Sequence, residues 1–295
     1  MSFLLDKQYI KATEEFLAYS SIPPQPKIIS DINKEISKPN ADLETVSDFI
    51  SRDVTMSAKL LKVVNSVFFG LREKVDSIHR ALSLIGIKNF RNIILASSLR
   101  EAFGSKDINF EKFWNHSMST ASFASRIARK VDFHSPEQAY LAGLFHDCGV
   151  PILLKSHKDY PDIIDDALSI VPVDSLSGKS KSIIGVEHER YSTHHCAVGY
   201  LVAKKWNMSD AVCDAIWHHH YVKVDIHNDE VTKKLVAIVL LADYMSSSLS
   251  SYAGGGFSVD PESEWAKMHD KVISELSINL DSVLDLKQDL QSMMQ

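Results

Sequence analysis

Histidines are concentrated in one part of this 295-residue chain. Eleven of the 13 histidines lie between His116 and His227. Histidine titrates near neutral pH and is the commonest protein ligand of transition metals. The concentration therefore indicates a metal site or an acid–base site in this region. Surface histidines gathered by chance are the alternative, and composition alone leaves both open.

His146 and Asp147 lie in the apolar segment LAGLFHDCGVPILL. An apolar segment tends to bury its polar members, and a buried carboxylate needs a cation, hydrogen bonds or protonation because unpaired desolvation is costly. Either both residues bind a metal ion, or Asp147 makes a local ion pair while His146 is a hydrogen-bonded core residue. The dipeptide alone does not decide between these interpretations.

Asp243 and His116 favour the metal interpretation. Asp243 is the only charged residue in the apolar segment that follows Lys234, and a divalent cation shared with Asp147 would neutralise both carboxylates. His116 lies in a separate helical segment, and helical bundles build internal metal sites from one or two ligands per helix. Mixed imidazole and carboxylate donors suit iron, manganese, zinc, nickel or cobalt better than calcium.

Further candidate ligands occur at two predicted helix ends. His195 stands at the start of one helix, and His219 and His220 end another. A helix C-terminus stabilises cationic histidine, which is the alternative explanation for the second group. Four further histidines of the region are predicted to be surface or loop residues: His134, His157, His188 and His227. Cys148 and Cys213 are predicted to be small buried apolar residues.

The elements that must position these residues are predicted to be helices. Apolar residues recur at spacings of three and four, and glycine and proline are scarce, so the fold class is all-α. Asp42 and Ser135-Pro136 are predicted helix starts, and Gly86 is a predicted helix end. The helices expected to carry the candidate ligands cover 110–131, 193–206, 209–219 and 231–250, together with one that starts at Ser135-Pro136 and runs through His146-Asp147 in the segment LAGLFHDCGVPILL.

The chain is predicted to contain three parts. An N-terminal helical part covers 1–104, a helical core that contains the candidate ligands covers 105–253, and a C-terminal helical extension covers 257–295. Loops are predicted at 105–107 and 172–181, and a flexible break at Gly254–Gly256. The extension is expected to pack back on the chain or to contact a partner.

Bulk composition argues against several classes of protein. The net charge of −6 argues against nucleic-acid binding. Asp6 and the lack of a long apolar run argue against a signal peptide, and no segment reaches the roughly 18 apolar residues of a membrane span. Three unpatterned cysteines fit a reducing compartment. We therefore expect a cytoplasmic protein with no membrane or nucleic-acid partner.

The order His116, His146-Asp147, Asp243 resembles the H…HD…D signature of the HD superfamily of metal-dependent phosphohydrolases. The N-terminal half is more specifically similar to the HDOD family (HD-related output domain), and this resemblance covers roughly residues 15 to 250. The matching residues are Ile22-Pro23-Pro24-Gln25-Pro26, Arg52-Asp53, Leu60-Leu61, Asn65-Ser66, Ile78, Ala81, Ile85-Gly86, His195 to Gly199, Trp206, Ala215-Ile216 and His219-His220. The resemblance implies an HD-type helical bundle with an N-terminal helical subdomain and a role in bacterial signalling.

The candidate ligand set is fuller than the HDOD resemblance implies. HDOD proteins usually lack part of the metal-ligand set, whereas this chain keeps His116, His146, Asp147 and Asp243, with His195, His219 and His220 as candidates for a second metal. That set resembles the HD-GYP phosphodiesterases of cyclic di-GMP. The chain departs from them at Val150, where those enzymes carry lysine, and after His220, where no glycine-tyrosine-proline motif follows. The resemblance therefore does not imply hydrolysis of cyclic di-GMP.

Two functional hypotheses follow. The first is a signalling module that holds a divalent transition metal and acts by binding a signalling protein partner or a ligand. The second is a metal-dependent phosphohydrolase of a nucleotide or another phosphoester, in which Asp147 would belong to the catalytic centre. A third, lesser hypothesis is a nucleotide sensor without turnover. Fold and motif residues alone do not establish chemistry, and the first hypothesis is favoured.

Overall fold

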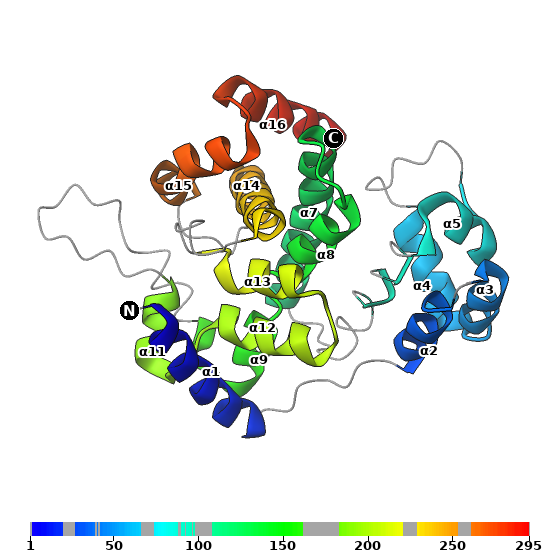
Figure 1. Ribbon diagram of the computed structural model, residues 1–295, viewed down its shortest axis with the longest axis horizontal. Coiled ribbons are helices and arrows are strands. Elements are labelled where there is room, and N and C mark those ends of the chain that lie inside the picture. Colours follow the sequence, from blue (N-terminus) through cyan, green and yellow to red (C-terminus); the bar gives the residue numbers. More distant parts are fainter. Residues whose placement is uncertain are drawn as a thin grey trace, which may run out of the picture. The chain divides into compact units, whose positions relative to one another are not determined.

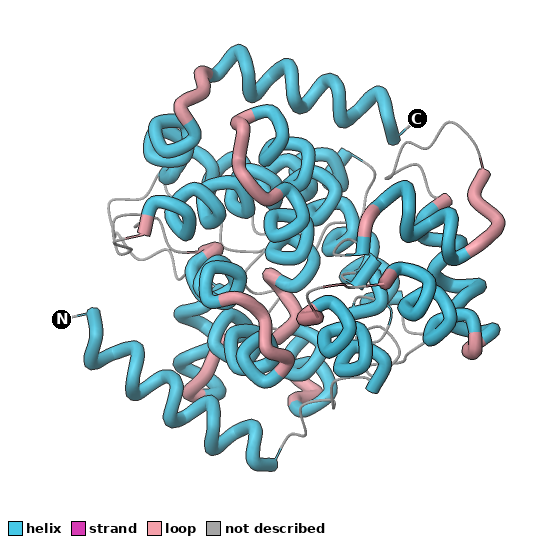
Figure 2. Tube along the Cα trace, turned by 45° about the vertical axis from the view of Figure 1, so that its right-hand side comes forward, coloured by secondary structure: helices cyan, strands magenta, loops and turns pink. Residues whose placement is uncertain are grey.

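The computed structural model describes residues 2–19, 27–38, 40, 42–65, 74–87, 90–91, 93–95, 97, 108–161, 183–220, 229–252 and 261–294. In these ranges every regular element is a helix, which confirms the predicted all-α class (Figure 2). The proline motif at 22–26, the loops predicted at 105–107 and 172–181, Gly254–Gly256 and His227 lie outside the described residues.

Contacts divide the chain into two compact units. One unit contains Met1–Ile22 together with Ser105–Gln295, and the other contains Pro23–Gly104. The first helix therefore groups with the histidine-rich part of the chain. The domain limits at 1–104, 105–253 and 257–295 stay a prediction.

The smaller unit contains four described helices. They are α2 (Lys27–Ile36), α3 (Leu43–Ser51), α4 (Val54–Val64) and α5 (Ile78–Ile85) (Figure 1). The predicted cap is confirmed, because the Asp42 side chain accepts hydrogen bonds from the backbone N–H groups of Glu44 and Thr45. The predicted end of α5 is also confirmed, since Gly86 follows it with φ of 78°, a conformation that favours glycine.

Asn65 has a structural role in the smaller unit. Its side-chain NH₂ group donates to the carbonyl of Val75 at 2.7 Å, and its side-chain oxygen accepts from the backbone N–H of the same residue at 2.7 Å. This pair of bonds connects the end of α4 to the segment that leads into α5. Asn65, one residue of the N-terminal motif, therefore stabilises the fold of this unit.

The larger unit contains ten described helices: α1 (Ser2–Tyr19), α7 (Ile108–Lys130), α8 (Pro136–Phe145), α9 (Val150–Ser156), α11 (Ile183–Tyr191), α12 (His195–Lys205), α13 (Asp210–His218), α14 (Glu230–Tyr252), α15 (Pro261–Leu276) and α16 (Leu280–Met294). The apolar helix α14 contacts α7, α8, α13 and α15 (Figure 1). Its residues Leu235–Ala242 are buried all round, as expected for a central helix. The predicted C-terminal helices are confirmed as α15 and α16.

Two glycines allow the helices around the histidines to approach closely. A Cβ atom on Gly149 would lie 2.0 Å from the carbonyl oxygen of His195, and one on Gly143 would lie 2.9 Å from the carbonyl oxygen of Thr120. The first contact brings the segment after Asp147 against the start of α12, and the second brings α8 against α7. Larger residues at either position would push the elements apart.

No helix in the described part of the chain combines the length and the apolar character that a membrane span requires.

Candidate metal centre

Five helix ends or faces bring the predicted ligands together. His116 comes from α7, His195 from the first residue of α12, and Asp243 from α14, while His219 and His220 follow α13. His146 and Asp147 lie in the turn between α8 and α9, so the prediction of one helix running through them is wrong. We call His116, His146, Asp147 and Asp243 the His116 cluster, and His195, Cys196, His219 and His220 the His195 cluster. Each cluster offers enough close donor atoms to hold a metal ion.

The His116 cluster places two imidazoles between two carboxylates. The Nε2 atom of His116 lies 3.0 Å from Oδ1 of Asp243 and 3.2 Å from Nε2 of His146. The Nε2 atom of His146 lies 3.3 Å from Oδ2 of Asp147. Four potential ligand atoms therefore face one another over distances typical of donors around one ion.

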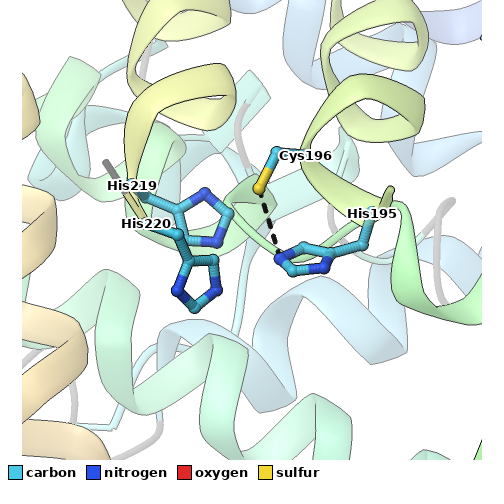
Figure 3. A group of neighbouring side chains, drawn as sticks. All are labelled: His195, Cys196, His219 and His220. Carbon is cyan, nitrogen blue, oxygen red and sulfur yellow. Dashed lines mark hydrogen bonds between the residues drawn. The ribbon is translucent and has the colours of Figure 1, made fainter. Parts of the chain in front are cut away.

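Asp147 joins the two clusters through its two oxygens. Its Oδ2 atom faces His146, whereas its Oδ1 atom lies 3.1 Å from Nε2 of His219 and 3.5 Å from Nε2 of His195. In the His195 cluster the four donor atoms lie within 4.8 Å of one another, and the side chains converge from α12 and the end of α13 (Figure 3). The arrangement places two adjacent groups of potential ligand atoms on either side of one carboxylate.

In four histidines of the clusters, Nδ1 is hydrogen-bonded to a group that is not a candidate ligand: His116, His146, His195 and His219. Nδ1 of His146 bonds the carbonyl of Gly143 at 2.7 Å, and Nδ1 of His219 bonds the carbonyl of Ile216 at 2.8 Å. A carbonyl only accepts, so each of these Nδ1 atoms is the donor, and Nε2 is the ring atom that faces the clusters. Such partners fix the tautomer and orientation that a metal-binding histidine needs.

A buried carboxylate anchors His195. Glu187 of α11 is fully buried, and its Oε2 atom lies 2.8 Å from Nδ1 of His195 and accepts from the backbone N–H of His195 at 3.0 Å. The hydroxyl of Tyr160 donates to the other Glu187 oxygen. His116 has a weaker anchor, since its Nδ1 atom lies 3.2 Å from the hydroxyl oxygen of Ser246.

The charges of the clusters depend on one another. Burial alone would raise the pKa of the Asp147 carboxyl, but the imidazoles of His146, His219 and His195 hold this pKa well below its usual range. Burial also opposes ionisation of Asp243, whose pKa is nevertheless lowered by its hydrogen bond to His116. Burial and the charge of His219 lower the pKa of His220 to about 3, so this imidazole is neutral at pH 7.

The two carboxylates are partly exposed, whereas three of the histidines are fully covered. The side chains of Asp147 and Asp243 are 20% and 21% exposed, whereas those of His146, His195 and His219 are 1% exposed or less. The carboxylates are therefore the more accessible side of the site. The imidazoles of His146, His195 and His219 are covered by the surrounding helices.

Several histidines and cysteines have other roles. His194 caps α12, because its ring accepts the backbone N–H of Ala197. His134 is exposed, as predicted, while His157 and His188 are half-buried and pack on the rings of Tyr191 and Tyr9. Cys148 and Cys213 are buried, which confirms their predicted place in the core.

Three residues near the clusters were not predicted. Glu187 and Ser246 hold His195 and His116, and Cys196 contributes its sulfur to the His195 cluster. Glu187 precedes His195 across a turn between two helices, so no helical spacing connects them. The only sequence signal for Cys196 is its position directly after two histidines.

Fold and site together define an all-helical protein of the HD type with a histidine–aspartate cluster. The HDOD domain model matches residues 22–222, and the chain belongs to the HDOD family. The resemblance inferred from the motifs is thus confirmed.

Known proteins support this assignment at the level of the fold. An HDOD domain protein of unknown function from Geobacter sulfurreducens is 21% identical with a TM-score of 0.67, covering 97% of this chain and 98% of its own. A candidate phosphohydrolase from Shewanella amazonensis is 19% identical with a TM-score of 0.68, covering 97% and 94%. The cyclic di-GMP phosphodiesterase CdgJ of Vibrio cholerae is 25% identical over 144 residues, 48% of this chain and 33% of CdgJ. The chain spans about two fifths or less of the length of the curated relatives it matches.

Proposed function

We propose that this chain is a signal-transduction module of the HDOD family whose two clusters hold a pair of divalent transition-metal ions and bind a phosphate-containing ligand. One observation carries the proposal. Four imidazole Nε2 atoms converge on the carboxylates of Asp147 and Asp243 while their Nδ1 atoms are held by other groups. A merely structural histidine would not need this shared orientation.

The donor set fits iron, manganese, zinc, nickel or cobalt. Imidazole and carboxylate donors favour these ions over calcium, which prefers six to eight oxygens. Divalent ions at the two positions would polarise a phosphate group and activate a water molecule. Asp147 and Asp243 are about one fifth exposed, so a phosphate would approach the ions from the carboxylate side.

The ligand-binding role is favoured over hydrolysis by the surroundings of the site. Val150, which stands where HD-GYP enzymes carry lysine, is buried in the core. Arg190 pairs with Asp159 at the surface, and Lys155 is exposed. Among the described residues, no lysine or arginine forms an ion pair with either cluster. This arrangement best supports a module that binds a phosphate-containing ligand through the ions and transfers the signal to a cytoplasmic protein partner.

Elemental analysis tests the metal centre. Purified protein is expected to contain about two equivalents of transition metal, in line with the two groups of donors. Asp147→Ala should lose most of the metal while remaining folded, and Asp210→Ala, an exposed aspartate of α13, should keep it. Wild-type protein that stays metal-free after incubation with each of the five ions would overturn the proposal.

A thermal-shift series tests the ligand. Metal-loaded wild-type protein is incubated with mono-, di- and cyclic dinucleotides, and saturable stabilisation by at least one of them is expected because a ligand that binds the folded state raises its stability. Asp147→Ala should show no such shift. The same loss in Asp210→Ala, or no shift with any nucleotide, would contradict binding at the clusters.

Metal-dependent phosphohydrolysis is the second candidate. The donor set favours it, since Asp147 lies between two positions where adjacent ions could share a phosphate. The decisive measurement is turnover of a phosphoester panel by the metal-loaded chain. Activity above the Asp147→Ala background would move the function from binding to catalysis, and equal rates would exclude these substrates.

A further inference from the structure

Cys196 has surroundings unlike those of the other described cysteines. Cys148 and Cys213 direct their thiols toward backbone carbonyls, those of Gly199 and Met208. Cys196 is equally buried, but its sulfur points toward imidazoles (Figure 3). A cysteine that only fills space in the core needs no such neighbours.

The start of α12 brings two donors into the same cluster. His194 caps the helix with its ring, so the next two residues, His195 and Cys196, occupy the first turn. The Cys196 sulfur lies 3.3 Å from Nε2 of His195, and it lies within 4.8 Å of donor atoms of His219 and His220. Tight packing at Gly149 and Gly199 holds this turn against Asp147 and α13.

The distance between the Cys196 sulfur and His195 is that of two ligands around one ion. Zinc–sulfur and zinc–nitrogen bonds at a tetrahedral angle place the two ligand atoms about 3.5 Å apart. The separation of 3.3 Å between the Cys196 sulfur and His195 matches this value. One ion could therefore bond both the Cys196 sulfur and Nε2 of His195.

We propose that Cys196 is a thiolate ligand of the metal ion in the His195 cluster, and that it makes this position select zinc or another thiophilic ion over manganese. The inference rests on the proposed metal centre and goes beyond it by assigning a ligand and a selectivity. Thiolate donors favour such ions, whereas carboxylate donors suit manganese. The two positions would then differ in the ion that they prefer.

Cobalt substitution gives a readout that does not depend on activity. The metal-free wild-type protein is titrated with Co²⁺, and a thiolate ligand is expected to produce an intense sulfur-to-cobalt charge-transfer band in the near ultraviolet. Imidazole and carboxylate ligands produce only weak visible bands. If wild-type protein binds two equivalents of cobalt without the charge-transfer band, the role of Cys196 is refuted while the metal centre stands.

Variants assign the band to one residue. Cys196→Ser should lose it entirely, and Cys213→Ser, which removes another buried thiol outside the clusters, should keep it. If Cys196→Ser fails to fold, the wild-type spectrum still decides whether a thiolate binds the ion. Retention of the full band in folded Cys196→Ser would overturn the assignment, and failure of the wild-type protein to bind any cobalt would overturn both this inference and the proposed metal centre.

Metal competition tests the selectivity. Wild-type protein exposed to equal zinc and manganese is expected to take up zinc in the His195 cluster. Cys196→Ser should weaken zinc binding there by more than ~100-fold, since even residues behind the ligands contribute 10- to 100-fold. An unchanged zinc-to-manganese ratio in the folded variant would show that the sulfur does not bind the ion.

Discussion

The two clusters share Asp147 but differ in their other donors. The His116 cluster adds the second carboxylate of Asp243, whereas the His195 cluster adds a third imidazole and a sulfur. The first set is richer in oxygen and negative charge, and the second is softer. If both clusters bind an ion, as we propose, one compact unit would contain two adjacent positions with different chemical preferences, and the shared carboxylate would make them interdependent.

The clusters also differ in how their histidines are anchored. His146 and His219 use the carbonyl three residues earlier, an anchor that their own helix end provides. His195 uses the buried carboxylate of Glu187, and His116 uses the hydroxyl of Ser246. A carboxylate makes the imidazole more basic than a neutral partner does, so loss of the Glu187 anchor should cost more than loss of the Ser246 anchor.

Asp147→Asn is expected to have the largest effect. The amide keeps the size of the side chain but removes the negative charge and one of the two acceptor oxygens, so both clusters lose a ligand. Affinity for both ions should fall by more than ~100-fold, beyond the range found for residues behind the ligands. Isothermal titration with zinc measures this, with Asp210→Asn as the matched control. Loss of one ion only would show that Asp147 does not belong to both positions.

Asp243→Asn and His220→Gln should each remove one ion. Asp243 contacts only His116 and His146 among the histidines described here, and His220 belongs to the other group of donors. Elemental analysis is expected to give about one equivalent of metal in each single variant, because each variant keeps the full set of ligands of only one cluster. The double variant should bind almost no metal. If either single variant loses both ions, the two positions are more strongly coupled than their separate donors indicate.

Glu187→Gln should weaken the His195 cluster by ~10- to 100-fold and leave the His116 cluster nearly unchanged. The amide oxygen can still accept one of the hydrogen bonds made to Glu187, but the negative charge beside the His195 ring is lost. Zinc affinity measured by competition with a chelator gives the change. Glu189→Gln, on the exposed side of the same helix, is the control. Equal loss in both variants would indicate a general effect of charge on the helix.

Helix positions were the most predictable part of the structure. Asp42, Ser135 and Gly86 mark helix ends through local chemistry, and all three act as predicted. The central place of α14 follows from a long apolar segment with a single carboxylate. These features depend on residues close together in the sequence, where spacing and capping rules apply.

The predicted ligands could be found because their residue types are costly to bury without a partner. The anchors could not, because glutamate and serine have many ordinary uses and lie far from the ligands that they hold. Ser246, for example, acts on a histidine 130 positions earlier. Only the packing of α7 against α14 brings the two together.

Ser246→Ala should have the smallest effect of the series. The hydroxyl forms a neutral hydrogen bond to Nδ1 of His116, and such bonds contribute about 0.5–1.5 kcal/mol, so affinity in the His116 cluster should fall only about 2- to 10-fold. Ser248→Ala, a buried serine on the same helix, serves as the control, and isothermal titration with manganese measures the difference. A loss as large as that of Glu187→Gln would mean that the hydroxyl is as important to its histidine as the buried carboxylate, and the distinction between the two anchors would fail.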